Sequence, residues 1–142
     1  MTLAFLTLIC SATFAATPEE ERNKRIAIDF YDAALNEKDW DKTKQYMGSR
    51  YVQHSIYMED GAAGLEALVN RIRTEFPQNH GEIKQAFADG DMVILQVHVT
   101  RYPGHAGWSV IELMRLENDK VVEHWDVFQP VPGEAANPHG MF

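Results

Sequence analysis

The segment VVEHWDVFQP, residues 121–130, carries two side chains that could do chemistry together, His124 and Asp126. The segment alternates as a β-strand does, and residues two apart on a strand share one face at a separation of about 6.6 Å. A carboxylate can remove a proton, and an imidazole beside it can donate or accept one. Because two such groups are costly to bury without a purpose, they are our first candidates for a functional pair.

Two further strand-like segments place ionisable residues among apolar ones. In 92–101 the odd positions from Val93 to Val99 are uniformly aliphatic, whereas His98 stands on the even side. In 108–116 the even positions are apolar apart from Glu112. Both residues are therefore candidates for the same site, although each also has an ordinary interpretation. Glu112 could be a solvated strand residue, and His98 a hydrogen-bonded core histidine or an exposed one.

Whether Glu112 joins the pair depends on the turn at Asn118-Asp119. A bulged turn, which we favour, places Glu112 opposite His124 on the face that also carries Asp126. A two-residue turn puts Glu112 on the other face, because a shift of one residue reverses every side chain of a strand. Both registers are compatible with the sequence.

Several histidines and a carboxylate are also a set that a metal ion accepts. None of them has the close helical spacing of a dedicated metal motif, so we expect neither a metal nor another cofactor. Three other histidines lie in segments rich in glycine or proline and are expected at the surface: His80, His105 and His139.

The elements that must position these residues begin with helices. Thr17-Pro18-Glu19-Glu20 is a capping box with proline at the first helical position, and apolar residues at helical spacing predict a helix over 18–36. A short second helix is expected around 40–47. Asp60 is the expected cap of a third helix, which Pro77 ends.

From Gly81 onward the apolar period changes to two. The dipeptides Asp89-Gly90 and Asn118-Asp119 are turn signals, so each predicts a β-hairpin. Helices come first and an antiparallel sheet second, which gives an α+β fold. The 142 residues suit one domain with a core of its own.

The N-terminus predicts a separate, processed segment. Residues 3–16 form an apolar run without a charge, too short for the roughly 20 residues that span a bilayer but suited to a secretory signal. We therefore expect a signal peptide over 1–15 and a mature domain over 16–142. The mature protein would be periplasmic or secreted without membrane insertion, or cytoplasmic if the run is a buried helix and is not cleaved. The only cysteine, Cys10, lies in this run.

Composition excludes several classes of function. The net charge is −8, so no basic surface is available for nucleic acid or for anionic membranes. The chain has no glycine-rich phosphate loop, no Gly-x-Ser-x-Gly nucleophile motif, no His-Glu-x-x-His motif and no Cys-x-x-Cys pair. What remains is an ordinary globular composition with polar residues on its strands.

The segment IELMRLENDKVVEHWDVFQPVP, residues 111–132, resembles the closing hairpin of SnoaL-like proteins in the nuclear transport factor 2-like superfamily. YVQHS at 51–55, VHVTR at 97–101 and the final GMF are similar to segments of the predicted SnoaL-like aldol-condensation enzymes within that group. The resemblance covers about 18–142. It implies a cone-shaped, curved antiparallel sheet wrapped around three helices, with a deep pocket between them that Asp126 faces.

The resemblance also implies an activity. An acidic residue on a pocket strand removes a proton next to a carbonyl group, which points to a cofactor-independent lyase, cyclase or isomerase acting on a small apolar carbonyl compound. Asp126 matches that base, with His54, His98 and His124 as polarising or orienting groups. The expected substrate-binding residues are Gln53, Glu112, Trp108 and Tyr31. A non-catalytic ligand-binding or interaction domain is the alternative.

A homodimer is the expected assembly, formed through the convex face of the sheet. The family resemblance and one apolar row on a strand favour it. The same row could equally be core, with the other face of that strand outside. The row consists of Val93, Leu95, Val97 and Val99.

Overall fold

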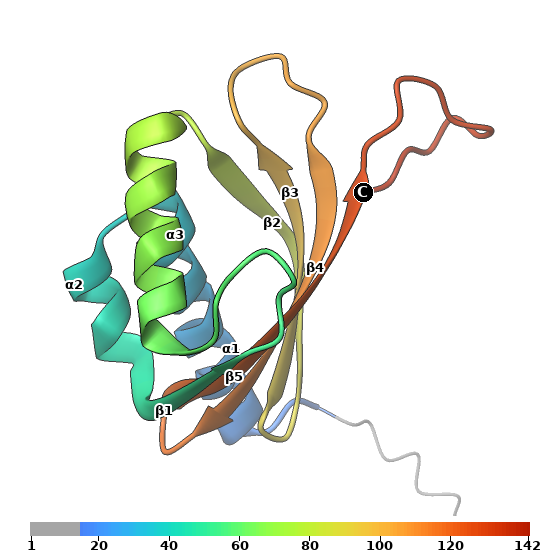
Figure 1. Cartoon of the computed structure of the whole chain (residues 1–142). Helices are drawn as coiled ribbons and strands as arrows, with labels where there is room; N and C mark the ends of the chain where they lie inside the picture. Colours follow the sequence, from blue (N-terminus) through green and yellow to red (C-terminus); the bar gives the residue numbers. More distant parts are fainter. Residues whose placement is uncertain (1–14) are drawn as a thin grey trace, which may run out of the picture.

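Helices fill the concave side of a strongly curved, five-stranded sheet (Figure 1). The computed structural model describes residues 15–142. Its helices come before and between the first strands, and the last four strands follow without interruption, which confirms the α+β class. In chain order the elements are α1 (Pro18–Tyr31), the π-helix η1 (Asp32–Asn36), α2 (Trp40–Thr43), the 3-10 helix η2 (Lys44–Tyr46), β1 (Met47–Gln53), α3 (Gly61–Glu75), β2 (His80–Asp89), β3 (Met92–Thr100), β4 (Trp108–Glu117) and β5 (Lys120–Pro130).

The capping box predicted at the start of α1 is present. Thr17 Oγ1 accepts from the Glu20 amide at 3.1 Å, and Glu20 Oε2 accepts from the Thr17 amide at 2.7 Å. The single helix expected over 18–36 instead changes to a π-helix at its end. There the Asn36 side chain exchanges two hydrogen bonds with the Gly81 backbone, at 2.8 and 2.9 Å. The wider last turn thus ties the helix to β2.

Asp60 caps α3 as predicted and also joins it to β1. Its carboxylate accepts from the amides of Gly61 and Gln53, both at 2.8 Å. These two backbone hydrogen bonds lower the pKa of Asp60 below its usual value. The loop between β1 and α3 is therefore anchored where the strand ends.

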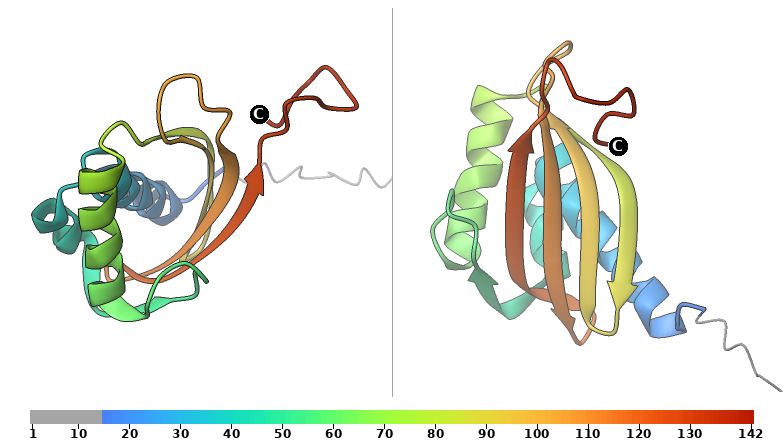
Figure 2. Two further views of the ribbon diagram at one scale, coloured as in Figure 1. Left: turned by 45° about the horizontal axis from the view of Figure 1, so that its top comes forward. Right: turned by 90° about the vertical axis from the view of Figure 1, so that its right-hand side faces the viewer.

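The strand order in the sheet is β1-β5-β4-β3-β2. The three hairpin pairs are antiparallel, but β1 runs parallel to β5, so the sheet is mixed where the sequence predicted only antiparallel pairs. The chain leaves β1 through α3, crosses to the far edge and returns strand by strand, so the last strand ends up beside the first. Figure 2 shows how the sheet bends around α1 and α3.

The β4–β5 hairpin differs from both predicted registers. Asn118 and Asp119 have φ values of 51° and 60°, so they form the two-residue turn that we did not favour. A bulge then leaves Val122 unpaired and shifts the register, so that Glu112 pairs with Asp126. The favoured pairing of Glu112 with His124 is therefore wrong, yet the bulge restores Glu112 to the face expected for it.

The apolar row of β3 forms the centre of the core. Val93, Leu95 and Val97 are fully buried and Val99 is 9% exposed. The use of this row as a dimer surface is therefore wrong, because it packs against the helices on the concave side. A homodimer through the convex face stays a prediction that needs other residues.

The predicted signal peptide lies almost wholly outside the described residues, so export and cleavage stay predictions. Within residues 15–142 no helix is long and apolar enough to cross a membrane.

Candidate active site

A cavity of about 410 Å³ lies between the helices and the inner face of the sheet. This volume is in the range of small-molecule pockets, ~300–1,000 Å³. Most of the lining is apolar and comes from α1, α3 and the inner residues of the strands. Five of the residues predicted from the sequence line it: Tyr31, Trp108, Glu112, His124 and Asp126.

His98 does not reach this cavity, so its predicted place in the site is wrong. It stands on the even side of β3, which faces outward because the odd side forms the core. Its Nε2 lies 2.8 Å from the Ala106 carbonyl oxygen, and its ring lies 4.6 Å from the ring of Phe142. His98 therefore holds a loop and the C-terminal tail against the convex face.

His54 also lies outside the cavity, contrary to the prediction. Its ring stacks on Trp125 at 4.7 Å with the two planes almost parallel, on the outer side of β5. Its Nε2 is 2.8 Å from Glu123 Oε1, and His54 is the largest cause of the lowered pKa of Glu123. The family resemblance alone had placed His54 in the site. β1 ends at Gln53, one residue before it, with Tyr51 and Gln53 on its buried side.

Gln53 is buried behind the cavity wall, where it orients other side chains instead of contacting a substrate. Its Oε1 accepts from the Ser55 amide at 2.8 Å, which fixes which end of the side-chain amide is the oxygen. The same oxygen faces His124 Nδ1 at 2.9 Å. Because an amide oxygen only accepts, His124 Nδ1 carries a proton.

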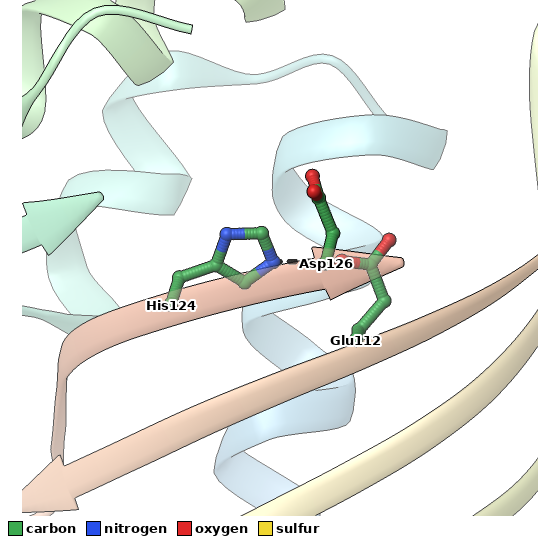
Figure 3. A group of neighbouring side chains, drawn as sticks. All are labelled: Glu112, His124 and Asp126. Atoms are coloured by element: carbon green, nitrogen blue, oxygen red, sulfur yellow. Dashed lines mark hydrogen bonds and ion pairs between the residues drawn. The ribbon is translucent and has the colours of Figure 1, made fainter. Parts of the chain in front are cut away.

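The other imidazole nitrogen, His124 Nε2, lies 2.7 Å from Glu112 Oε2 (Figure 3). Both residues are buried, with exposed fractions of 6% and 3%. With Nδ1 already protonated, a neutral imidazole and an ionised carboxylate would place two acceptors in contact, so one proton lies between them. The pair is then either imidazolium with carboxylate or imidazole with carboxylic acid, and its net charge is zero in both forms.

Asp126 stands directly across from Glu112 and points into the same space (Figure 3). It is half-buried, and within residues 15–142 no donor hydrogen-bonds to its carboxylate. Like charges directly opposite on neighbouring strands repel. Because His124 neutralises Glu112, Asp126 can stay ionised beside it as the only net charge of the three.

The same three residues are the candidates for a metal site. Glu112, His124 and Asp126 each offer one ligand atom, and these atoms lie within 4.8 Å of one another. The set has one histidine and two carboxylates, fewer histidines than the metal alternative assumed. A cation bound there would have to replace the proton between Glu112 and His124.

Tyr51 is a residue of this site that the sequence analysis missed. It lines the cavity, and its hydroxyl oxygen accepts from Gln53 Nε2 at 3.1 Å. Burial raises the pKa of Tyr51 far above its ordinary value, and the charges of Glu112 and Asp126 raise it further, so the phenol stays protonated. No acceptor in the described chain takes its O–H, which is free to donate to a ligand. Its position two residues before Gln53 on one strand was the available signal.

Tyr31 lines the cavity with its ring while its hydroxyl is covered. Burial, then Glu112 and Asp32, raise the pKa of Tyr31 well above the ordinary value. The hydroxyl has no hydrogen-bond partner in the described chain. It lies so close to Gly81 that a Cβ there would come within 2.1 Å of it. The predicted substrate-binding role of Tyr31 is thus limited to its ring.

The sequence as a whole matches one protein family. The SnoaL-like polyketide cyclases match over residues 25–136. The chain belongs to this family. Members of the family share a fold, so the curved sheet and its cavity have the architecture that the resemblance implied. No curated protein matches the chain in sequence.

Solved structures support the fold of this SnoaL-like chain. AclR of Streptomyces galilaeus is 24% identical over 78% of this chain and 81% of its own, with a TM-score of 0.65. A nuclear transport factor 2-like protein of unknown function from Burkholderia xenovorans is 20% identical over 84% of this chain and 91% of its own, with a TM-score of 0.66. An LEH-like epoxide hydrolase of M. tuberculosis is 19% identical over 79% of this chain and 86% of its own, with a TM-score of 0.63. At these identities the likeness concerns the fold alone.

Proposed function

We propose that this SnoaL-like protein is a cofactor-independent enzyme that removes a proton next to the carbonyl group of a small molecule, with Asp126 as general base. One observation carries the proposal: Asp126 lies unpaired in a mostly apolar cavity, beside a Glu112–His124 pair that holds its own proton. No hydrogen bond within residues 15–142 occupies the carboxylate oxygens of Asp126. The carboxylate is therefore open to a substrate.

Tyr51 supplies the second half of the chemistry. As Asp126 removes the proton from carbon, the electron pair of the broken C–H bond moves toward the carbonyl carbon, and negative charge develops on the carbonyl oxygen. The Tyr51 O–H, held in place by Gln53, donates a hydrogen bond to that oxygen. Such a donor stabilises the developing charge strongly in a site from which water is largely excluded.

The resulting enolate has three outcomes, which correspond to the three reaction types. It can take the proton back from Asp126 at another carbon, which is isomerisation. It can attack a second carbonyl carbon within the same molecule, which is aldol closure. It can expel a leaving group from the next carbon, which is elimination. All three begin with the same proton transfer, and the shape of the cavity decides among them.

A non-catalytic ligand-binding domain would use the same cavity without turnover. The unpaired carboxylate favours the enzyme, because a half-buried charge that no donor satisfies costs free energy without helping to bind an apolar ligand. Proton exchange distinguishes the two. The chain is incubated with aryl and alkyl ketones in deuterated water, and loss of the proton signal next to the carbonyl is followed by NMR. Catalysed exchange is expected; a ligand that binds without exchange favours the binding domain.

A further inference from the structure

We propose that the ligand of this pocket carries a carboxylate group, which Arg101 binds at one end of the cavity with Arg71 beside it. The inference rests on the proposed function, because it names the class of substrate for the same site. Neither arginine was singled out by the sequence. Both line the cavity that contains Asp126.

Arg101 is held in one orientation without an acidic partner. Its guanidinium carbon lies 4.3 Å from the centre of the Phe76 ring and 5.6 Å from that of Trp108. Its Nη1 donates to Asn79 Oδ1 at 3.3 Å. No carboxylate among residues 15–142 forms an ion pair with it. The two rings and the amide fix the plane of the group but do not neutralise its charge.

Further positive charge gathers around the same point. Arg71, on α3, is near enough that its charge adds to burial in lowering the pKa of Arg101, while Glu75, which pairs with Arg71 at 3.0 Å, acts in the opposite direction. The ammonium of Lys38 donates to the Asn79 carbonyl oxygen at 2.9 Å, so Asn79 contacts two cations, one through each of its oxygens. Glu75 offsets part of this positive charge, and a bound anion would offset more of it.

The geometry favours a carboxylate. A guanidinium has five N–H donors in a flat fork that matches the two oxygens of a carboxylate, and Asn79 uses one of them. The Arg71 side chain is 62% exposed, so this end of the cavity meets solvent and admits a charged group. The deeper walls are mostly apolar.

The backbone separation of the two ends along β4 gives the approximate length of the ligand. Trp108, which lies against Arg101, and Glu112, which pairs with Asp126, are four residues apart on β4. At about 3.3 Å per residue, this separation is about 13 Å. The ligand class is therefore an elongated acid: a carboxylate at Arg101, an apolar body, and a carbonyl group that reaches Asp126.

The test uses ω-(acetylphenyl)alkanoates of increasing chain length, with their primary amides as uncharged equivalents, and calorimetry of the full chain. We expect one chain length to bind best and its carboxylate to bind about 10–100-fold more tightly than its amide, the usual value of a charge-assisted hydrogen bond. In Arg101→Gln that preference should disappear while the amide binds as before. Arg101→Lys should keep part of it, because the charge remains without the fork.

Arg73→Gln is the matched control, since Arg73 is an exposed residue of α3 that does not line the cavity. It should leave the preference intact, and Arg71→Gln should reduce it. Equal binding of acid and amide, no binding of either, or a preference that survives Arg101→Gln would overturn the inference. Should Arg101→Gln fail to fold, Arg101→Lys and Arg71→Gln give the same comparison.

The outcome is separable from that of the proposed function. Asp126→Asn should bind the carboxylate at least as tightly as the wild type while losing proton exchange. If proton exchange occurs but acids bind no more tightly than their amides, only the proposed carboxylate group of the ligand is contradicted. A preference for acids without exchange would contradict the proposed catalysis alone.

Discussion

Glu112 Oε2 and His124 Nε2 lie 2.7 Å apart and hold one proton between them, because the Gln53 side-chain oxygen requires the opposite nitrogen of His124 to be protonated. The pair is neutral as a unit. Asp126, which pairs with Glu112 on the neighbouring strand, is then left as the single net charge of the three residues.

Replacing His124 should destabilise the fold, because His124 neutralises the buried Glu112. In His124→Phe the buried carboxyl group of Glu112 loses its partner, and we expect a loss of about 3–5 kcal/mol of unfolding free energy near pH 7, the usual cost of leaving a buried charge unpaired. Adding Glu112→Gln to that variant should recover part of the loss, because the charge is then gone. Urea unfolding measures both. A double variant no more stable than the single one would show that the two residues are not coupled.

Gln53 should control which imidazole nitrogen bears the proton. In Gln53→Leu the Ser55 amide and His124 Nδ1 both lose their acceptor, so unfolding should become easier by about 1–3 kcal/mol for each buried donor that stays unpaired. Nitrogen NMR of the imidazole reports the tautomer directly. A protonated Nδ1 is expected in the wild type, and a wild-type spectrum with Nδ1 unprotonated would contradict the assignment.

Tyr51→Phe tests the hydroxyl as the donor to the substrate oxygen. We expect proton exchange to slow by about 10²–10³-fold, as when one donor to a developing oxyanion is removed. Tyr102→Phe is the control, because Tyr102 is 55% exposed and lies outside the cavity. An unchanged exchange rate in Tyr51→Phe would remove this tyrosine from the mechanism.

The buried tyrosines should make the fold sensitive to alkali. The pKa values of Tyr31 and Tyr51 are raised in the folded chain, chiefly by burial. Their contribution to stability is therefore complete below about pH 10, the value in an unfolded chain, and declines as the pH rises above it. The decline is about 1.4 kcal/mol per pH unit for each tyrosine. Unfolding midpoints across this range should fall less steeply in Tyr51→Phe, and an unchanged slope would contradict the raised pKa.

The elements themselves could be predicted because their signals are local. The capping box at Thr17, the cap at Asp60 and the turn at Asn118-Asp119 each depend on a few neighbouring residues, and all three are present. Alternation on β5 likewise placed His124 and Asp126 on one face, to which the bulge at Val122 adds Glu112. The class of fold follows from such signals together with the family resemblance.

The sequence does not show which face of each strand the helices cover. His98 was placed in the site because alternation defines two faces of β3 without saying which one the helices cover. His54 was placed in the site by the family resemblance alone, with no pattern of its own strand to support it. The bulge at Val122 has no sequence signal that we recognised, although it decides the register. Arg101 matters through Phe76 and Asn79, which are distant from it in the chain.

The central claim is that Asp126 is the base, and replacing it with asparagine tests that claim most directly. Asparagine keeps the size of the side chain but removes the basic oxygen. Stability should change little or rise, because a half-buried carboxylate without a hydrogen bond is costly to desolvate. A large drop in the melting temperature of Asp126→Asn would instead identify a structural role.

The decisive measurement is the rate of proton exchange on one bound ketone in deuterated water, compared among the wild type, Asp126→Asn and the exposed turn variant Asp89→Asn. We predict that Asp126→Asn loses about 10²–10⁴-fold in rate, the usual contribution of a general base, while it still binds the ketone. Asp89→Asn should exchange as the wild type does. Exchange at the wild-type rate in folded Asp126→Asn would contradict the account.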